Sequence, residues 1–286
     1  MDEGARRAGR QGRAGGDHAG PRSGADPREE VSAVPGAARR GPRHGLARVL
    51  SKAGVCSRAE ASRWIAAGRV SIDGRVVRDP EFPIGARERA GIRIDGRPLD
   101  PAERVHLMLN KPRGLVTTAR DERGRDTVYR CFDGAGLPWL APVGRLDRAS
   151  EGLLLFCNDP EWAAAITDPA RGPDKTYHVQ IDRVPDETLL AHLQAGIDCD
   201  GEWLRAKRAQ LLRSGGRTAW LEVVLDEGRN RQIRRLMEAC GLEVMRLVRV
   251  AIGPLVLGDL AKGRWRRLTA DEVRLLSSQQ QTVTEP

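Results

Sequence analysis

A short apolar run at residues 153–156, with the sequence LLLF, most constrains how this chain can fold. The run does not alternate between apolar and polar residues, and it is bounded by Gly152 and by Asn158-Asp159-Pro160. Such a run is typical of a strand that is buried on both faces of a sheet. A strand of this kind is a rigid support, so we expect the residues before it to be held in one conformation.

The segment before this strand carries one acid between two arginines. Asp147 lies between Arg145 and Arg148. A carboxylate close to guanidinium groups stays ionised, because opposite charge favours its charged form. On a rigid support it can act as a nucleophile or as a base. A surface turn whose acid pairs with neighbouring arginines would have the same local sequence, so the rest of the chain must decide between these interpretations.

The charge of the chain favours a polyanionic partner. The 286 residues carry a formal net charge of +9, and arginine supplies most of the positive charge. This balance points to nucleic acid first and to an acidic membrane surface second. The five cysteines are scattered and contain no Cys-x-x-Cys, which argues against a disulfide framework or a zinc cluster and for the cytoplasm. We also find no apolar signal-peptide core and no run of the ~18 apolar residues needed to span a bilayer.

Two terminal segments have compositions typical of disorder. Residues 1–43 are rich in Gly, Arg, Ala and Pro, and residues 276–286 are rich in Ser, Gln and Thr. Neither can bury enough apolar surface to offset the entropy lost on ordering. We predict a disordered basic tail at 1–43 and a second disordered tail at 276–286. The basic tail is a solubilising extension, the product of an over-called start codon, or a source of loose affinity for RNA.

Residues 44–103 predict a compact α-α-β module. Leu46, Val49 and Leu50 have helical spacing, and Gly54 ends this first helix. Residues 57–60 (SRAE) form a capping box that begins a second helix, which ends at Gly68. Two Asp-Gly turns then predict two β-hairpins, which join 70–72 to 75–77 and 92–94 to 97–99.

Basic residues cluster on the two helices of this module, where clustered arginines suit phosphate contacts. A solvated helix face would have the same composition. Residues 44–73, with the sequence HGLARVLSKAGVCSRAEASRWIAAGRVSID, resemble the alpha-L RNA-binding motif first described in a small-subunit ribosomal protein. That resemblance implies that the helical face grips structured RNA. The candidate contacts are Arg48, Lys52, Ser57, Arg58, Arg63 and Arg69.

Residues 104–275 predict a second domain of the mixed α+β class, with a mainly antiparallel sheet. The helix at 231–240 buries a stripe of Ile233, Leu236, Met237 and Cys240, and its arginines lie off that stripe. Tyr177 lies on the buried face of an alternating strand. The other predicted strands are 105–109, 115–118, 153–156, 175–181, 204–212, 218–225, 244–250 and 255–257, and the other helices are 161–167 and 185–195, with a turn at 110–114 and a final element at 268–275.

Familiar catalytic motifs are absent from the sequence. There is no Gly-x-Gly-x-x-Gly, no phosphate-binding Gly-x-x-x-x-Gly-Lys-Ser/Thr loop and no Gly-x-Ser-x-Gly elbow. The five histidines have no metal-ligand spacing, and Cys157 and Cys240 occupy apolar positions typical of a core. The remaining reactive groups are a carboxylate, arginines and a tyrosine.

Five segments between residues 107 and 269 resemble the ribosomal-RNA pseudouridine synthases of the RsuA type. They are LNKPRG at 109–114, GRLDRASEGLLLF at 144–156, KTYHV at 175–179, EGRNRQIRRL at 227–236 and RLVRVAIGPLVLGDLAKG at 246–263. The resemblance implies an isomerase that cleaves the N1–C1′ bond of a chosen uridine and rejoins the uracil through C5. It implies that no cofactor and no metal is required.

The resemblance also implies roles for individual residues. Asp147 is the catalytic carboxylate, acting as nucleophile or as base, and Arg234 is the basic residue that pairs with it. Tyr177 is the active-site tyrosine, whose ring can stack on an extruded base, and Leu247 lines the uracil pocket. Candidates for contact with the RNA backbone are Lys111, Arg145, Arg229 and Arg231.

The expected partner is ribosomal RNA, as a structured stem-loop or as an assembly intermediate, and we expect the protein to act as a monomer. Two alternatives stay open. One is a non-catalytic RNA-binding assembly factor that retains the fold. The other is a glycosidase, which needs a second paired carboxylate. Glu151 and Asp159 are near Asp147 in sequence, but nothing marks either of them as that partner.

Overall fold

The computed structural model describes residues 43–278. The tails predicted at 1–43 and 276–286 lie outside the described residues, except for Arg43 and residues 276–278. Residues 276–278 belong to the last helix, where the side chain of Leu276 is fully buried, so the second tail was predicted to begin too early. Within residues 43–278, no helix is both long enough and apolar enough to cross a membrane.

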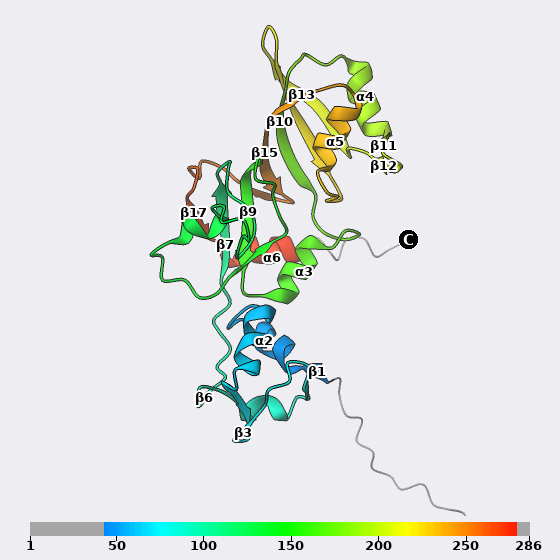
Figure 1. Ribbon diagram of the computed structural model, residues 1–286. Helices are drawn as coiled ribbons and strands as arrows, with labels where there is room; N and C mark the ends of the chain where they lie inside the picture. The colour runs from blue at the N-terminus through cyan, green and yellow to red at the C-terminus, as the bar shows by residue number, and fades with distance from the viewer. Residues whose placement is uncertain (1–42, 279–286) are drawn as a thin grey trace, which may run out of the picture. The chain divides into compact units, whose positions relative to one another are not determined.

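The first part of the chain forms the predicted α-α-β module around its own apolar core (Figure 1). Four of its strands make an antiparallel sheet in the order β3-β2-β5-β6. Its elements are β1 (His44–Gly45), α1 (Leu46–Lys52), α2 (Arg58–Ala66), β2 (Val70–Ile72), β3 (Arg75–Val76), β4 (Pro83–Ile84), the 3-10 helix η1 (Glu88–Gly91), β5 (Ile92–Ile94) and β6 (Arg97–Pro98).

Local sequence signals set the ends of these elements, as predicted. The Ser57 hydroxyl accepts a hydrogen bond from the Glu60 backbone N–H at 3.0 Å and caps α2. Asp73 and Asp95 have φ angles of 48° and 49°. Each is followed by a glycine that also has a positive φ, which is the backbone conformation that a tight two-residue hairpin requires.

The rest of the chain folds around a nine-stranded mixed sheet in the order β13-β14-β10-β15-β9-β7-β17. The strands β8 and β16 pair with β9 and β15 off this path. The pair β15–β9 is parallel and the other described pairs are antiparallel, which confirms the predicted α+β class. The elements are β7 (His106–Lys111), η2 (Val128–Phe132), β8 (Ala141–Val143), β9 (Glu151–Cys157), α3 (Pro160–Thr167), β10 (Lys175–Ile181), α4 (Glu187–Ala195), β11 (Ile197–Cys199), β12 (Glu202–Leu204), β13 (Arg208–Ser214), β14 (Ala219–Leu225), α5 (Gln232–Ala239), β15 (Val244–Ile252), β16 (Leu255–Val256), β17 (Trp265–Arg267) and α6 (Ala270–Ser278).

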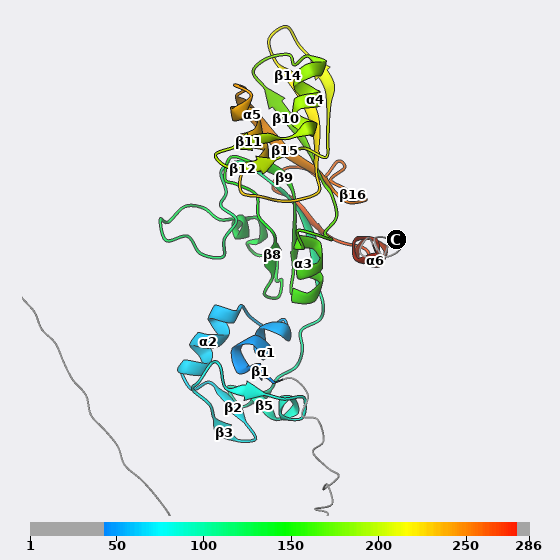
Figure 2. The same cartoon turned by 90° about the vertical axis from the view of Figure 1, so that its right-hand side faces the viewer.

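The strand β9, which is labelled in Figures 1 and 2, is buried on both faces, as its sequence predicts. Leu154 and Phe156 pack in the apolar cluster that includes side chains of α4 and α5. Leu153 and Leu155 pack in a second cluster with side chains of α3 and α6. The loop that carries Asp147 therefore leads directly into a strand that is packed on both faces.

Several predicted boundaries were wrong. The strand β7 continues through Lys111, where a turn was predicted. Residues 115–118 form no strand, and only Val116 makes an isolated bridge there. This segment instead forms a hydrogen bond to the Asp147 loop: the Thr117 hydroxyl donates to the Leu146 carbonyl at 2.7 Å. The strand predicted at 204–212 is interrupted between β12 and β13, and β17 was not predicted.

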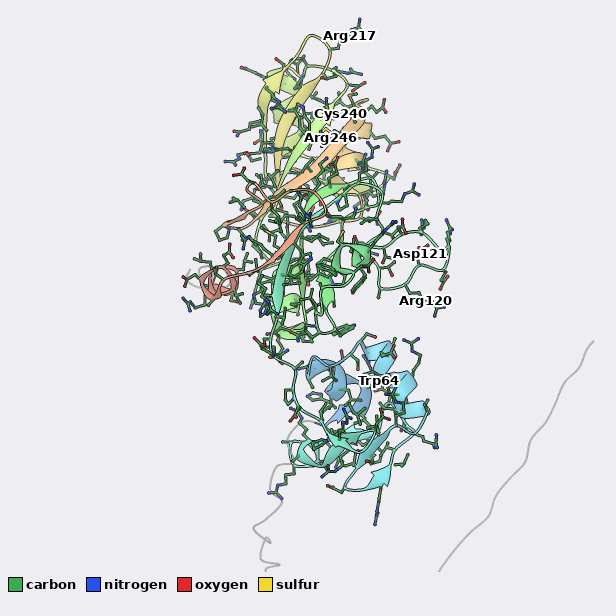
Figure 3. All side chains as sticks on the ribbon, turned by 90° about the vertical axis from the view of Figure 1, so that its left-hand side faces the viewer. Trp64, Arg120, Asp121, Arg217, Cys240 and Arg246 are labelled. Atoms are coloured by element: carbon green, nitrogen blue, oxygen red, sulfur yellow. The ribbon has the colours of Figure 1, made fainter. Side chains whose placement is uncertain are left out.

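Two exposed features extend from this sheet. Figure 3 shows Arg217 at the tip of the β13–β14 hairpin and Arg120 and Asp121 on the long loop that follows β7. The Asp121 carboxylate binds Arg125 within this loop at 2.6 Å. Arg120 has no ion pair or hydrogen bond from its side chain among residues 43–278, so its charge is open to solvent.

Candidate active site

Asp147 lies in the loop between β8 and β9, and the backbone of this loop is bound at successive carbonyl groups. The Thr117 hydroxyl holds the Leu146 carbonyl at 2.7 Å. The Gly114 N–H donates to the Arg148 carbonyl at 2.8 Å. Both donors come from the segment that follows β7. Because backbone hydrogen bonds fix the loop from outside, the position of Asp147 does not depend on its own side-chain contacts.

Lys111 completes this support from inside the protein. Its side chain is fully buried, and its Nζ donates to the carbonyls of Pro112, Asp147 and Ser150 at 3.2, 3.1 and 2.9 Å. Burial lowers the pKa of Lys111 to about 8, and the nearby charge of Asp147 acts in the opposite direction. The prediction that Lys111 contacts the RNA backbone was wrong, because no surface of this side chain is accessible.

The carboxylate of Asp147 pairs with Arg231, which was not the predicted partner. The Arg231 Nη1 lies 3.7 Å from the Asp147 Oδ2. Arg231 precedes α5 with a φ of 49°, a left-handed conformation that is uncommon for arginine. The predicted partner, Arg234, donates instead to the carbonyls of Ala149 and Val244 at 3.4 and 3.3 Å. Arg234 therefore supports the loop backbone, and its pKa is lowered first by burial and then by Arg231.

A cavity of about 790 Å³ brings together residues from three distant segments of the chain. Asp147 lines it from the loop, Tyr177 from β10 and Leu247 from β15. Tyr177 is 9% exposed, and its hydroxyl has no hydrogen-bond partner among residues 43–278. Leu247 lies opposite Val179 in the β10–β15 register, two residues along the strand from Tyr177 and therefore on the same face. The cavity thus presents a carboxylate, an aromatic ring and an apolar wall.

The cavity wall is also strongly basic, but its arginines differ in their partners. Arg145 lines the cavity, is exposed, and forms no ion pair in the part of the chain that the structure describes. Arg229 lies between the carboxylates of Glu202 and Glu227, at 2.6 and 2.8 Å. A second hollow of about 460 Å³ shares Asp147, Arg148 and Arg231 with this cavity and is also lined by Arg113. Arg145 is therefore freer to meet an anion than Arg229.

Neither carboxylate considered for a glycosidase lines the cavity. Glu151 is buried and binds Arg246 at 3.1 Å and Lys262 at 2.5 Å. Burial alone would raise the pKa of Glu151, but the hydrogen bonds from these two cations lower it. Asp159 caps α3 through the N–H groups of residues 161 and 162. Glu227 does line the cavity, but its carboxylate is bound to Arg229 and to the side-chain amide of Gln232.

In the N-terminal module, most of the predicted basic contacts already pair with acids. Lys52, Arg58, Arg63 and Arg69 each form an ion pair, and Arg69 also lies over the Trp64 ring at 5.0 Å. Ser57 is engaged as a helix cap, and Arg48 is exposed without an ion pair among the described residues. Exposed ion pairs contribute only about 0–1 kcal/mol, so a phosphate can replace their acids. These contacts remain predictions.

Comparison with known proteins agrees with this geometry. The chain matches the RNA pseudouridylate synthase family over residues 105–239 and the S4 domain over residues 45–90. It is 36% identical over 234 residues to the ribosomal large subunit pseudouridine synthase B of Bacillus subtilis (strain 168), a match that covers 81% of this chain and 94% of that protein. The chain belongs to the RNA pseudouridine synthase family.

Further members of the RNA pseudouridine synthase family show the same likeness. An uncharacterized RNA pseudouridine synthase of Aquifex aeolicus (strain VF5) is 35% identical over 79% of this chain and 91% of its own length. A crystal structure of a pseudouridylate synthase superposes with a TM-score of 0.57 at 31% identity, covering 82% of this chain and 99% of that chain. The protein is therefore an isomerase with an RNA substrate, and the N-terminal module is an S4 domain, as its sequence predicts.

Sequence reasoning missed several residues of the site. Thr117 and Gly114 hold the Asp147 loop, but nothing in their local sequence distinguishes them from ordinary turn residues. Lys175 and Arg249 line the cavity. Both fall inside segments that resemble the family, and both lie on strand faces that the alternation of β10 and β15 could have assigned to the same side as Tyr177 and Leu247.

Proposed function

We propose that this protein isomerises a specific uridine of ribosomal RNA to pseudouridine, with Asp147 as the catalytic carboxylate. The N1–C1′ bond of the uridine breaks, a C5–C1′ bond forms, and the hydrogen on C5 is replaced by one on N1. Relatives in Bacillus subtilis and Haemophilus influenzae are named ribosomal large subunit pseudouridine synthase B, so we place the target uridine in the large-subunit RNA.

The observation that carries this proposal is the meeting of Asp147, Tyr177 and Leu247 on the wall of one cavity. The target base must leave its stack, which costs a few kcal/mol and costs least at an unpaired position. In the cavity, the Tyr177 ring offers a stacking surface and Leu247 excludes water from the edge of the base. Asp147 then faces the sugar, either to attack it or to take a proton from it.

The basic surface near Asp147 supports binding of an RNA backbone. Arg113, Arg148 and Arg231 line the second hollow, and Arg145 lines the cavity itself. Guanidinium groups bind phosphate oxygens in a forked geometry, and such contacts position a nucleic acid without reading its sequence. The choice of one uridine then depends on the shape of the RNA and on how easily its base can be extruded.

The test is to map pseudouridine in large-subunit RNA from cells with and without this gene, and then to treat the unmodified RNA with purified protein. We expect one position to lose pseudouridine when the gene is absent and to regain it in the purified reaction. If the purified protein binds the RNA but forms no pseudouridine in free RNA or in assembly intermediates, it is an RNA-binding assembly factor and the proposal is wrong.

A further inference from the structure

Two cations beside the active-site tyrosine have no partner that would balance their charge. Lys175 lies on β10 two residues before Tyr177, and Arg249 lies opposite Tyr177 on β15. Both line the same cavity as Asp147. They were not among the predicted site residues, and the proposed chemistry uses neither of them.

The guanidinium of Arg249 is buried and only partly bonded. The residue is 6% exposed, and its Nε donates to the Leu153 carbonyl at 2.7 Å. Its Nη2 is buried without a hydrogen-bond partner, and Arg249 forms no ion pair within residues 43–278. Removing a charge from water is unfavourable unless another charge or hydrogen bonds compensate for it. A buried guanidinium with one unbonded nitrogen and no ion pair can therefore accept an anion as a partner.

Lys175 is half-buried and has no hydrogen bond or ion pair from its side chain among the described residues. Burial lowers the pKa of Lys175, and the charge of Arg249 lowers it further. Three acids act on it from a distance, but each has another partner. Asp174 binds Lys207 at 2.8 Å, Asp226 binds Arg205 at 3.4 Å, and Asp168 accepts the N–H groups of residues 170 and 171.

We propose that Lys175 and Arg249 form an anion subsite that binds one phosphodiester of the RNA strand next to the extruded uridine. This inference rests on the proposed function. Uracil is neutral and cannot balance two cations, whereas every linkage of the RNA carries a negative charge. Lys175 is displaced from Tyr177 by two residues along the strand, roughly 6.6 Å, which separates the phosphate from the base that stacks on the ring. The subsite therefore fixes the position of the extruded nucleotide.

The first measurement is the salt dependence of RNA binding. The probe is a large-subunit RNA fragment, and the variants are Lys175→Gln and, as a matched control, Arg274→Gln on α6. We expect Lys175→Gln to weaken binding and to make the slope of log affinity against log salt concentration shallower by about 0.7, the value for one single-stranded phosphate. Arg274→Gln should leave the slope unchanged. An unchanged slope for Lys175→Gln would overturn the proposal.

The second measurement identifies the phosphate. Fragments are made with a neutral methylphosphonate at one of the linkages that flank the mapped uridine, and binding is measured with Asp147→Ala protein, which does not turn over. At one of these linkages, methylphosphonate should weaken binding of the RNA to the Asp147→Ala protein. The same methylphosphonate should have no effect on binding to the double variant Asp147→Ala, Lys175→Gln. Equal penalties with and without Lys175→Gln at every linkage would contradict the subsite. With Lys175→Arg in place of Lys175→Gln, the positive charge is kept, so methylphosphonate at that linkage should again weaken binding.

Arg249 is tested by conservative replacement because its burial makes larger changes disruptive. Arg249→Lys keeps the charge, so it should fold with a thermal midpoint near that of the parent and retain part of the methylphosphonate penalty. Pseudouridine formation by the unmodified protein is measured in parallel. If pseudouridine forms while the methylphosphonate penalty at every linkage is independent of Lys175, this lack of coupling means that the subsite is wrong and the function stands. If the coupling is present but no pseudouridine forms, the function is wrong and the subsite stands.

Discussion

The buried Nζ of Lys111 donates a hydrogen bond to the backbone carbonyl of Asp147 at 3.1 Å. The same Nζ also binds the carbonyl of Ser150 at 2.9 Å, so one cation closes the turn that presents the carboxylate proposed to be catalytic. The contact is to backbone rather than to the Asp147 side chain. Lys111 is therefore a positioning residue, and its removal should change the geometry of catalysis more than the binding of RNA.

Replacing Lys111 with methionine should destabilise the protein and reduce turnover. The change keeps most of the apolar volume but leaves buried carbonyls without a donor, and each unsatisfied group costs about 1–3 kcal/mol. We expect a lower free energy of unfolding in urea and a lower kcat, with RNA affinity within about twofold of the original. Arg274→Met removes an exposed cation on α6, far in sequence from the Asp147 loop, and serves as the control. A larger effect on RNA affinity than on kcat would contradict the assignment.

The stability of the protein should depend on the ionisation of Lys111. Burial lowers the pKa of Lys111 in the folded protein from 10.5 to about 8. Between these two values the unfolded chain binds a proton that the folded protein has released, so the contribution of this group to stability rises with pH. Below about pH 8 both states hold the proton, and the contribution no longer changes. Unfolding free energies should therefore rise from pH 8 to 10 more in the original protein than in Lys111→Met.

Asp147→Ala should abolish pseudouridine formation while RNA binding remains. The loop backbone is held by Lys111, Thr117 and Gly114, so removal of the carboxylate should not displace it. Loss of a positioned acid or base lowers rates by about 10²–10⁴-fold, and a covalent route is closed altogether when its nucleophile is removed. The measurement is single-turnover formation of pseudouridine together with the Kd for the RNA. Asp133→Ala, an exposed acid outside the cavity, should retain full activity.

Gly152→Ala should disrupt the pairing of β9 with β15. Gly152 has a φ of +100°, and an added Cβ would lie 2.2 Å from the Arg249 carbonyl oxygen. This contact is with backbone, so the two strands would have to separate. We expect a loss of about 1–3 kcal/mol in the free energy of unfolding. Gly216→Ala in the β13–β14 turn has open space around its Cβ and should have little effect. Equal thermal midpoints for the two variants would refute this reading.

Arg48→Gln in the S4 domain should weaken RNA binding more than Arg63→Gln. Arg48 is exposed without an ion pair among residues 43–278, whereas Arg63 pairs with Glu60 one turn away on α2. A phosphate that binds Arg63 must first replace this acid, so less binding energy is gained there. The measurement is the Kd of each variant for a large-subunit RNA fragment, with kcat at saturating RNA unchanged in both. Equal Kd values for both variants and the original protein would exclude the surface formed by α1 and α2 as an RNA-binding surface.

Local sequence sufficed for those features that depend on neighbouring residues alone. The capping serine at 57, the two Asp-Gly turns and the doubly buried strand at 153–156 all follow from short-range hydrogen bonding or from apolar patterning. The resemblance to a family then indicated Asp147, Tyr177 and Leu247, and the structure places all three on one cavity wall. The roles of these residues in the reaction remain predictions.

Tertiary structure alone decided which polar group meets which. From sequence, Lys111 reads as a charge in a turn, and it is instead buried beneath the loop of Asp147. Arg231 rather than Arg234 reaches the carboxylate, and Arg234 donates instead to the carbonyls of Ala149 and Val244. Strand pairing placed Lys175 and Arg249 beside Tyr177. Such contacts join residues far apart in the chain, so their partners are fixed by sheet register and burial, which no local pattern encodes.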